Sequence, residues 1–206
     1  MSHRVTPDMV LHGYCVGVFP MGHANDMITW HEPDPRCVFE FERFKLSRSL
    51  RKTVERNVFD VRVNSAFEQV MRACGDRREG TWITRRILDL YCELHGQGFA
   101  HSVECWKDES LVGGLYGVAI GAAFFGESMF HRATDASKVA LVHLIRRLRE
   151  RGYVLLDTQW STPHLASLGA VQIARDEYLA RLEVAVRQPR SFTDESPEVG
   201  MVESSE

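Results

Sequence analysis

Two polar side chains, Asp157 and Gln159, follow a short apolar run at residues 154–156. Such a run is typical of a buried strand, and side chains two apart on a strand point to one face, so we expect both at one edge of a sheet. A carboxylate placed there can accept a proton or orient an amine, and a glutamine amide can donate to an oxygen that gains negative charge. Taken alone, the pair also fits an ordinary polar strand end.

A second acid, Glu127, stands before Ser128 and Met129 at the end of another extended run. Its carboxylate suits an ammonium group, although a buried ion pair would explain it equally well. Met129 is flexible and apolar, which suits the wall of a pocket but also an ordinary core. Trp82 lies in a polar loop, where a large ring is available to stack on a nucleic-acid base, and Trp30 has a similar setting.

The 206 residues carry a formal net charge of −3, which argues against a surface coated in positive charge for bulk nucleic-acid binding. A local basic patch remains open: Arg48, Arg51 and Lys52 recur at helical spacing, and the alternative is a solvated helix face. Further basic clusters lie at residues 77–86 and 146–151. The five cysteines form no CxxC and no other metal-ligand spacing, so we expect reduced thiols, no metal and a cytoplasmic protein.

Periodicity and capping signals predict an α/β domain with a mixed sheet, because hairpin-paired strands are followed by a helix and another strand. Helices are expected over residues 6–18, 47–56, 65–74, 84–96, 136–151, 163–168 and 175–187. The spacing from Ser65 to Glu68 predicts a capping box at the start of the third. Extended segments are expected at residues 27–30, 37–41, 59–63, 101–106, 111–120, 122–128 and 154–158.

Three parts of the chain are expected: a small N-terminal subdomain or cover over residues 1–65, a core over 66–192 and a disordered acidic tail over 193–206. The first residues lack the basic-then-apolar order of a secretory signal, and no stretch approaches the ~20 apolar residues of a membrane span.

Several longer strings occur in a fixed order along the chain. They are Gly17-Val18-Phe19-Pro20, Trp30-His31-Glu32-Pro33-Asp34-Pro35-Arg36, Glu79-Gly80-Thr81-Trp82-Ile83-Thr84, Leu111-Val112-Gly113-Gly114-Leu115-Tyr116-Gly117, Phe125-Gly126-Glu127-Ser128-Met129-Phe130, Ala136-Ser137-Lys138, Leu156-Asp157-Thr158-Gln159 and His164-Leu165-Ala166-Ser167-Leu168-Gly169-Ala170. In order and spacing, the strings resemble the bacterial leucyl/phenylalanyl-tRNA–protein transferases, over about residues 10–192.

The resemblance implies a core similar to the GNAT acyltransferases behind a shortened N-terminal subdomain. It implies transfer of Leu or Phe from an aminoacyl-tRNA to proteins that begin with Arg or Lys, which marks them for degradation through the N-degron pathway. That reaction is the aminolysis of an already activated ester, so neither a covalent enzyme intermediate nor a cofactor is expected.

Site residues also follow from the resemblance. Asp157 and Gln159 become the catalytic pair, in which Asp157 either accepts the proton or positions the reacting groups, and Arg48, Arg51 and Lys52 become the tRNA-binding segment. The expected substrate-binding residues are Glu127, Ser128, Met129, Leu115, Phe124, Leu148, Trp82 and Trp30.

This sequence departs from the family pattern in three places. The N-terminal region is shorter than usual, His31-Glu32 stands where Trp-Ser is common, and Ser161-Thr162-Pro163 replaces a common Leu-Asn-Asp. The sequence disfavours two alternative functions. An acetyl-CoA-dependent acetyltransferase is disfavoured because residues 131–137 contain no glycine to cradle a pyrophosphate and include an acid, Asp135. A non-catalytic aminoacyl-tRNA-binding module is disfavoured because both Asp157 and Gln159 are present.

Overall fold

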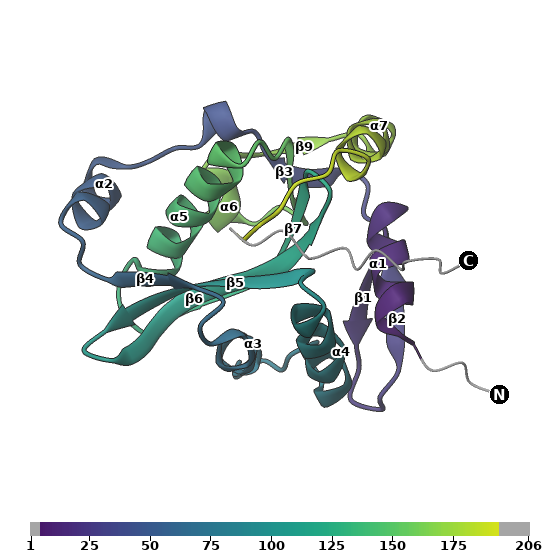
Figure 1. Cartoon of the computed structure of the whole chain (residues 1–206), viewed down its shortest axis with the longest axis horizontal. Coiled ribbons are helices and arrows are strands. Elements are labelled where there is room, and N and C mark those ends of the chain that lie inside the picture. The colour runs from purple at the N-terminus through teal and green to yellow at the C-terminus, as the bar shows by residue number, and fades with distance from the viewer. Residues whose placement is uncertain (1–4, 194–206) are drawn as a thin grey trace, which may run out of the picture.

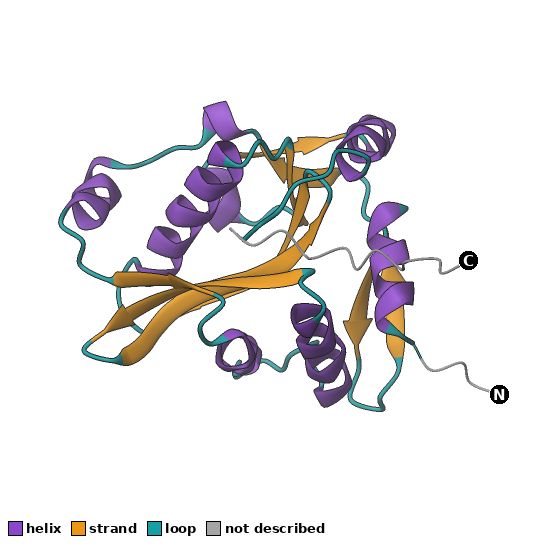
Figure 2. Ribbon diagram, viewed as in Figure 1, coloured by secondary structure: helices purple, strands orange, loops and turns teal. Residues whose placement is uncertain are grey.

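A computed structural model describes residues 5–193, and it confirms the α/β class with a mixed sheet. Seven strands form one twisted sheet in the order β4-β5-β6-β7-β8-β3-β9, and a separate hairpin, β1-β2, lies beside it (Figures 1 and 2). The strands are β1 Phe19–Gly22, β2 Ile28–His31, β3 Arg36–Phe39, β4 Asp60–Val63, β5 Ala100–Lys107, β6 Ser110–Ile120, β7 Ala123–His131, β8 Leu155–Gln159 and β9 Ala170–Ile173.

Helices cover both faces of the sheet, so the molecule has two apolar cores. On one face α1, α3 and α4 share a core with Tyr116 and Phe125, and on the other α2 and α5 share a core with Leu115 and Phe124. The α-helices are α1 Pro7–Cys15, α2 Arg48–Glu55, α3 Phe67–Gly75, α4 Arg85–Gly96, α5 Ala136–Glu150, α6 Pro163–Ser167 and α7 Arg175–Val186, and a 3-10 helix spans Phe41–Arg43. Figure 1 shows α5 and α3 on opposite sides of β4, β5 and β6.

Strands β7 and β8 are the only parallel pair in the order, and their pairing is short. It runs from Ala123 opposite Leu155 to Phe125 opposite Asp157. Beyond that point β7 continues against β6 alone, and the end of β8 pairs with β3. The two strands therefore diverge after the pair Phe125–Asp157, and the side chains beyond this pair either fill the space between the strands or enclose a cavity.

Two local predictions are wrong for identifiable reasons. The first helix ends at Cys15, three residues early, and Gly17 lies in the left-handed region at φ 86°. The capping box does not form: Ala66 is the N-cap of α3 and makes no side-chain capping bond, while the Ser65 hydroxyl donates to Glu104 Oε2 (2.8 Å). Because Glu104 is a buried acceptor, it competes successfully for the serine.

The sheet draws on more of the chain than the sequence predicted. Strand β9 of the sheet was not predicted, and neither was β1 of the separate hairpin. Strand β3 precedes residue 65 in the sequence, yet it lies in the sheet between β8 and β9. The proposed division at residue 65 stays a prediction, with β3 and β4 both belonging to the seven-stranded sheet. Residues 194–206, which carry nearly all of the expected acidic tail, lie outside the described part of the chain.

Candidate active site

The divergence of β7 and β8 creates two neighbouring cavities of about 100 Å³ and about 300 Å³. Both are lined by residues that follow the last β7–β8 pair: Glu127, Ser128 and Met129 from β7, and Thr158 and Gln159 from β8. Residue exposure rises along β7 at the same place, because positions 122–125 are buried and positions 126–129 are partly exposed. The sheet therefore opens where three of the residues singled out from the sequence are found.

Asp157 lies behind these cavities and lines neither of them. Its side chain is fully buried and receives hydrogen bonds from Arg36 Nη2 (2.7 Å) and Nε (3.0 Å), from the Tyr178 hydroxyl (2.9 Å) and from the Gln159 backbone N–H (2.9 Å). Burial, with the neighbouring Asp157 charge, raises the pKa of Tyr178, so its hydroxyl remains a donor. Asp157 is thus an anchor, tied to a buried arginine and to the backbone of Gln159.

Gln159 lines both cavities, although it stands only two residues from Asp157. The expectation that both side chains share one exposed edge is not met, for two reasons. The register of β8 against β3 shifts between Cys37 and Val38, and Gln159 itself takes a left-handed φ of 58°. Its side-chain Nε2 donates to Glu127 Oε1 (3.1 Å), which leaves its second N–H and its carbonyl oxygen free for a substrate.

Glu127 is the extra residue of a β-bulge, because Tyr116 pairs with Ser128 and Gly117 pairs with Gly126. A bulge re-aims the side chain at which it occurs, and here it turns the carboxylate toward α1 and α4. Tyr14 of α1 donates to Oε1 (2.7 Å), and Tyr91 of α4 lies 3.5 Å from Oε2.

The environment of Glu127 favours its protonated form. Burial raises the pKa of this carboxyl from 4.5 to about 8, and the Asp157 charge adds to the rise while the Tyr14 hydrogen bond opposes it. The two tyrosine hydroxyls are also hydrogen bonded to each other. With the pKa near neutrality, Glu127 can both accept and release a proton.

The smaller cavity has the apolar wall expected of a side-chain pocket. Leu115 and Met129 line it as predicted, together with Leu141, Leu144 and Leu156, which the sequence did not single out. Phe124 and Leu148, two other predicted members, are fully buried in the same apolar core and do not line it. Ser128 lines both cavities and accepts a hydrogen bond from Arg77 Nη2 (2.8 Å).

The larger cavity has an aromatic rim. Trp82 lines it as predicted, beside Phe19 and Trp160, whose rings meet edge to face with centroids 4.9 Å apart. Trp30 does not line it; its ring covers α1 so closely that a Cβ at Gly13 would lie 2.5 Å from it. Trp160 was not among the predicted site residues, although its position directly after Gln159 could have indicated it.

The network that holds the acids was also missed. Tyr14, Tyr91, Tyr178 and Arg36 come from four separate elements, and only Arg36 belongs to one of the recognised strings. An isolated tyrosine on a helix gives no signal of the carboxylate that it will meet across the core. Arg77 was seen only as part of a basic cluster, whereas the structure places it on the lining of the larger cavity.

The predicted tRNA-binding residues lie on the outer face of α2. Arg48, Arg51 and Lys52 are exposed, while Leu50 and Val54 face the core. None of the three basic side chains has a carboxylate partner within residues 5–193. They do not line the reaction cavities.

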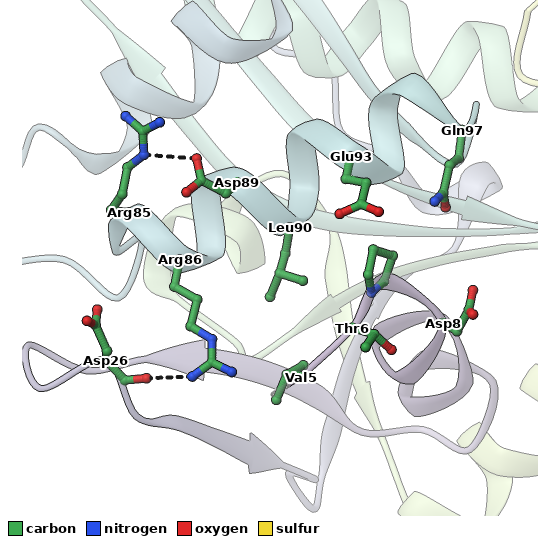
Figure 3. Close-up of a pocket in the computed structure, with 11 residues that line it drawn as sticks. Val5, Thr6, Asp8, Asp26, Arg85, Arg86, Asp89, Leu90, Glu93 and Gln97 are labelled. Carbon is green, nitrogen blue, oxygen red and sulfur yellow. Dashed lines mark hydrogen bonds and ion pairs between the residues drawn. The ribbon is translucent and has the colours of Figure 1, made fainter. Parts of the chain in front are cut away.

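A wider groove of about 900 Å³ lies between the start of α1 and the side of α4, and Figure 3 shows its lining. Its two arginines are engaged, Arg85 with Asp89 (2.9 Å) and Arg86 with the carbonyl oxygen of Asp26 (3.0 Å). It shares no lining residue with the cavities at Gln159, and no predicted site residue lies in it. Among the described residues, no cluster of side chains could hold a metal ion, and no helix is long and apolar enough to cross a membrane.

Comparison with known proteins assigns two consecutive parts of the chain to one family. Residues 38–183 match the family described as leucyl/phenylalanyl-tRNA protein transferase, and residues 4–34 match the N-terminal domain of the same family. A transferase of that name from Herpetosiphon aurantiacus is 47% identical over 193 residues, covering 93% of this chain and 100% of the relative. Another from Ruegeria sp. is 50% identical over 190 residues, covering 91% of this chain and 90% of the relative.

Among solved structures, L-PGS from Bacillus licheniformis is similar with a TM-score of 0.41 and 16% identity, covering 78% of this chain and 55% of the other. That likeness is too weak to define a shared fold, and the expected GNAT-like character of the core stays a prediction.

Proposed function

The chain belongs to the leucyl/phenylalanyl-tRNA protein transferase family and is an aminoacyl-tRNA–protein transferase, and we propose that it moves Leu or Phe onto proteins beginning with Arg or Lys. The new N-terminal residue then marks the acceptor for degradation through the N-degron pathway. One observation supports the chemistry best: an apolar pocket opens beside a protonatable carboxylate, Glu127, and a free amide donor, Gln159.

The reaction joins the α-amine of the acceptor to the carbonyl carbon of the aminoacyl ester. As the C–N bond forms, the carbonyl oxygen gains negative charge, and collapse of the tetrahedral intermediate expels the ribose hydroxyl of the tRNA. The free N–H of Gln159 is suited to donate to that oxygen. The small cavity, with Leu115 and Met129 on its wall, is suited to the Leu or Phe side chain.

Glu127 is better suited than Asp157 to take the proton that the attacking amine loses. It lines the cavity, and the pKa of its carboxyl, about 8, matches the pKa of an α-amine, which is roughly 8. Asp157 is enclosed by Arg36, Tyr178 and the Gln159 backbone and lines neither cavity. We therefore assign Asp157 the role of positioning the site, and we assign Glu127 the role of accepting the proton from the attacking amine.

Trp82, with Phe19 and Trp160, offers ring faces and edges on which the terminal adenine can stack. The exposed face of α2 suits the acceptor stem, because Arg48, Arg51 and Lys52 have no carboxylate partner in the part of the chain that the structure describes. The competing basic cluster at residues 146–151 is partly engaged, since Arg147 donates to the Phe192 carbonyl and Arg151 to the Thr193 carbonyl.

A direct test uses the purified chain, labelled Leu-tRNA and a protein that begins with Arg. Label should appear on the protein without ATP or acetyl-CoA, and Edman sequencing should find leucine before the original arginine. The matched control is the same protein with its N-terminus acetylated, which has no free α-amine and should stay unlabelled. Labelling of the acetylated protein, or none of either protein, would overturn the proposal.

A further inference from the structure

The larger reaction cavity contains one side chain that the chemistry above does not use, Arg77. It comes from the loop after α3, and among residues 5–193 it is the only arginine or lysine that lines the cavity together with Glu127 and Gln159. Eight other arginines (Arg36, Arg43, Arg62, Arg72, Arg85, Arg175, Arg181 and Arg187) lie within 4.0 Å of a carboxylate oxygen. Arg77 has no carboxylate partner among the described residues, so its positive charge remains available to a ligand.

Two hydrogen bonds hold the Arg77 guanidinium in place. Its Nε donates to the Cys74 carbonyl at the end of α3 (3.0 Å), and one Nη2 hydrogen is directed to the Ser128 hydroxyl (2.8 Å). An arginine carries five N–H donors, so both hydrogens of Nη1 and one of Nη2 remain free. A planar pair of nitrogens with free hydrogens matches two oxygens of a phosphate. The side chain is thus positioned by neutral groups while its anion-binding edge stays open.

Arg77 also stands where the cavity meets the surface. It lines a second groove of about 300 Å³ that continues outward past Asp76, His131 and Arg132. A nucleotide whose ester lies at Gln159 and whose base stacks at Trp82 directs its 5′ side away from the reacting atoms. The one cation on that outward path within the cavity is Arg77.

We infer that Arg77 binds the 5′-phosphate of the terminal adenosine of the aminoacyl-tRNA. This inference rests on the proposed function, because it assumes an aminoacyl-nucleotide donor at Gln159. It assigns phosphate recognition to a site separate from the basic face of α2, so that the last nucleotide is held at its base, its ester and its phosphate.

Two minimal donors that differ only in this phosphate provide the test. In both donors leucine is esterified to the ribose hydroxyl of adenosine, as in the aminoacyl-tRNA. Leucyl-adenosine has a free 5′-hydroxyl, leucyl-adenosine 5′-phosphate carries a phosphate there, and each is given with a peptide that begins with Arg. The wild-type chain should use the phosphorylated donor with a kcat/KM about tenfold higher at low salt, since charge-assisted hydrogen bonds at exposed sites are of that size. In Arg77→Ala the ratio of the two kcat/KM values should fall to about one, because only the phosphorylated donor loses a contact.

The matched control is Arg132→Ala, which removes the same charge from the adjoining groove but not from the cavity. It should keep the wild-type preference, which separates a specific contact from a general loss of positive potential. Arg77→Lys should keep only part of the preference, because an ammonium retains the charge but not the paired donors.

Each remaining outcome decides against the inference. An unchanged preference in Arg77→Ala, or an equal loss with both donors, shows that Arg77 serves the acceptor or the fold. A wild-type chain that transfers leucine from both donors equally has no phosphate site here. If the wild type transfers leucine from neither minimal donor nor from Leu-tRNA, the proposed function itself fails, which is a different result.

Discussion

Asp157 and Glu127 lie on neighbouring strands, β8 and β7, close to the point where the two strands diverge, and the structure gives the two carboxylates opposite surroundings. Asp157 is fully buried and shares its charge with Arg36, with Tyr178 and a backbone N–H completing its hydrogen bonds. Glu127 is partly buried, and its direct hydrogen-bond partners are the neutral groups of Tyr14, Tyr91 and Gln159.

The difference separates two ways in which a carboxylate serves a site. An acid that is tied to a buried arginine and to the backbone fixes geometry, while burial of Glu127 raises the pKa of its carboxyl to about 8 and so allows it to exchange a proton near neutral pH. Both carboxylates follow apolar strand residues in the sequence, so their roles are decided by partners from distant elements.

Replacing Glu127 with Gln should have the largest effect on activity. The amide keeps the shape and can still meet Tyr14 and Gln159, but it cannot take a proton from the amine. Loss of a general base commonly lowers a rate by about 10²–10⁴-fold. Transfer from Leu-tRNA to an Arg-starting peptide measures the effect, and the thermal unfolding midpoint serves as the control for folding.

Transfer of leucine by Glu127→Gln at the wild-type rate would contradict the assignment of Glu127 as the proton acceptor. Asp157 or a substrate group would then have to remove the proton, and the enclosure of Asp157 would need to open during turnover.

Replacing Asp157 with Ala should have the largest effect on stability. It leaves Arg36, which is 1% exposed, with a buried charge and no carboxylate, and removing one partner of a buried ion pair costs about 3–5 kcal/mol. Urea denaturation of the variant and the wild type measures the difference.

The double variant Arg36→Met/Asp157→Leu supplies the control, because it removes both charges together. Its stability should recover most of the loss, since a buried pair of ions contributes little beyond an apolar replacement. A single variant as stable as the wild type would show that Asp157 does not anchor this part of the sheet.

The fold was more predictable than this division of labour. Periodicity located most of the helices and strands because each pattern reports its own element, as it does for α2 with Leu50 and Val54 inward. The strand β3 was expected, yet its position between β8 and β9 is a long-range pairing that no local pattern encodes.

The same limit applies to the site. Gln159, Glu127, Met129 and Trp82 were found because they stand in recognisable strings, and they do line the cavities. Phe124 and Leu148 are buried in the core and do not line the smaller cavity, and an apolar residue in a core and one in a pocket look alike in sequence. The bulge that presents Glu127 depends on pairing with Tyr116 and Gly117, which lie ten or more residues away.

A pH profile of kcat/KM tests the roles of the two carboxylates, because a rate that requires one ionised group changes about tenfold for each pH unit below the pKa of that group. If Glu127 must be ionised to act, kcat/KM should rise up to about pH 8, where its pKa lies, and then level off. The acceptor amine must also lose a proton in this range, so the test is the difference between two profiles. Below pH 8, the slope for Glu127→Gln should be smaller than the wild-type slope by about one.

Stability should change with pH in the opposite sense. The pKa of Glu127 is higher in the folded chain (about 8) than its ordinary value of 4.5, so the folded state holds this proton more tightly. Its contribution to stability is complete below pH 4.5 and is lost as the pH rises through about 8. Relative to Glu127→Gln, the wild type should therefore become less stable from about pH 4.5 to about pH 8 and change little above that. Parallel stability curves would show that burial does not perturb this carboxyl.

The smallest effect is expected for the tyrosines that hold Glu127. Tyr14→Phe removes the shorter contact (2.7 Å), and Tyr91→Phe removes the longer one (3.5 Å). Since a hydrogen bond to the ionised form lowers a carboxyl pKa, its loss should move the midpoint of the rate profile to higher pH. The shift should be larger for Tyr14→Phe, and at neutral pH the rate should fall by a few fold, the size expected for one hydrogen bond of about 0.5–1.5 kcal/mol.

The control is the pH–rate profile of Tyr178→Phe, which removes a hydrogen-bond donor from Asp157 (2.9 Å). This variant should be less stable than the wild type, but the midpoint of its rate profile should not move. If Tyr178→Phe moves the midpoint and Tyr14→Phe does not, the assignments of the two carboxylates must be exchanged.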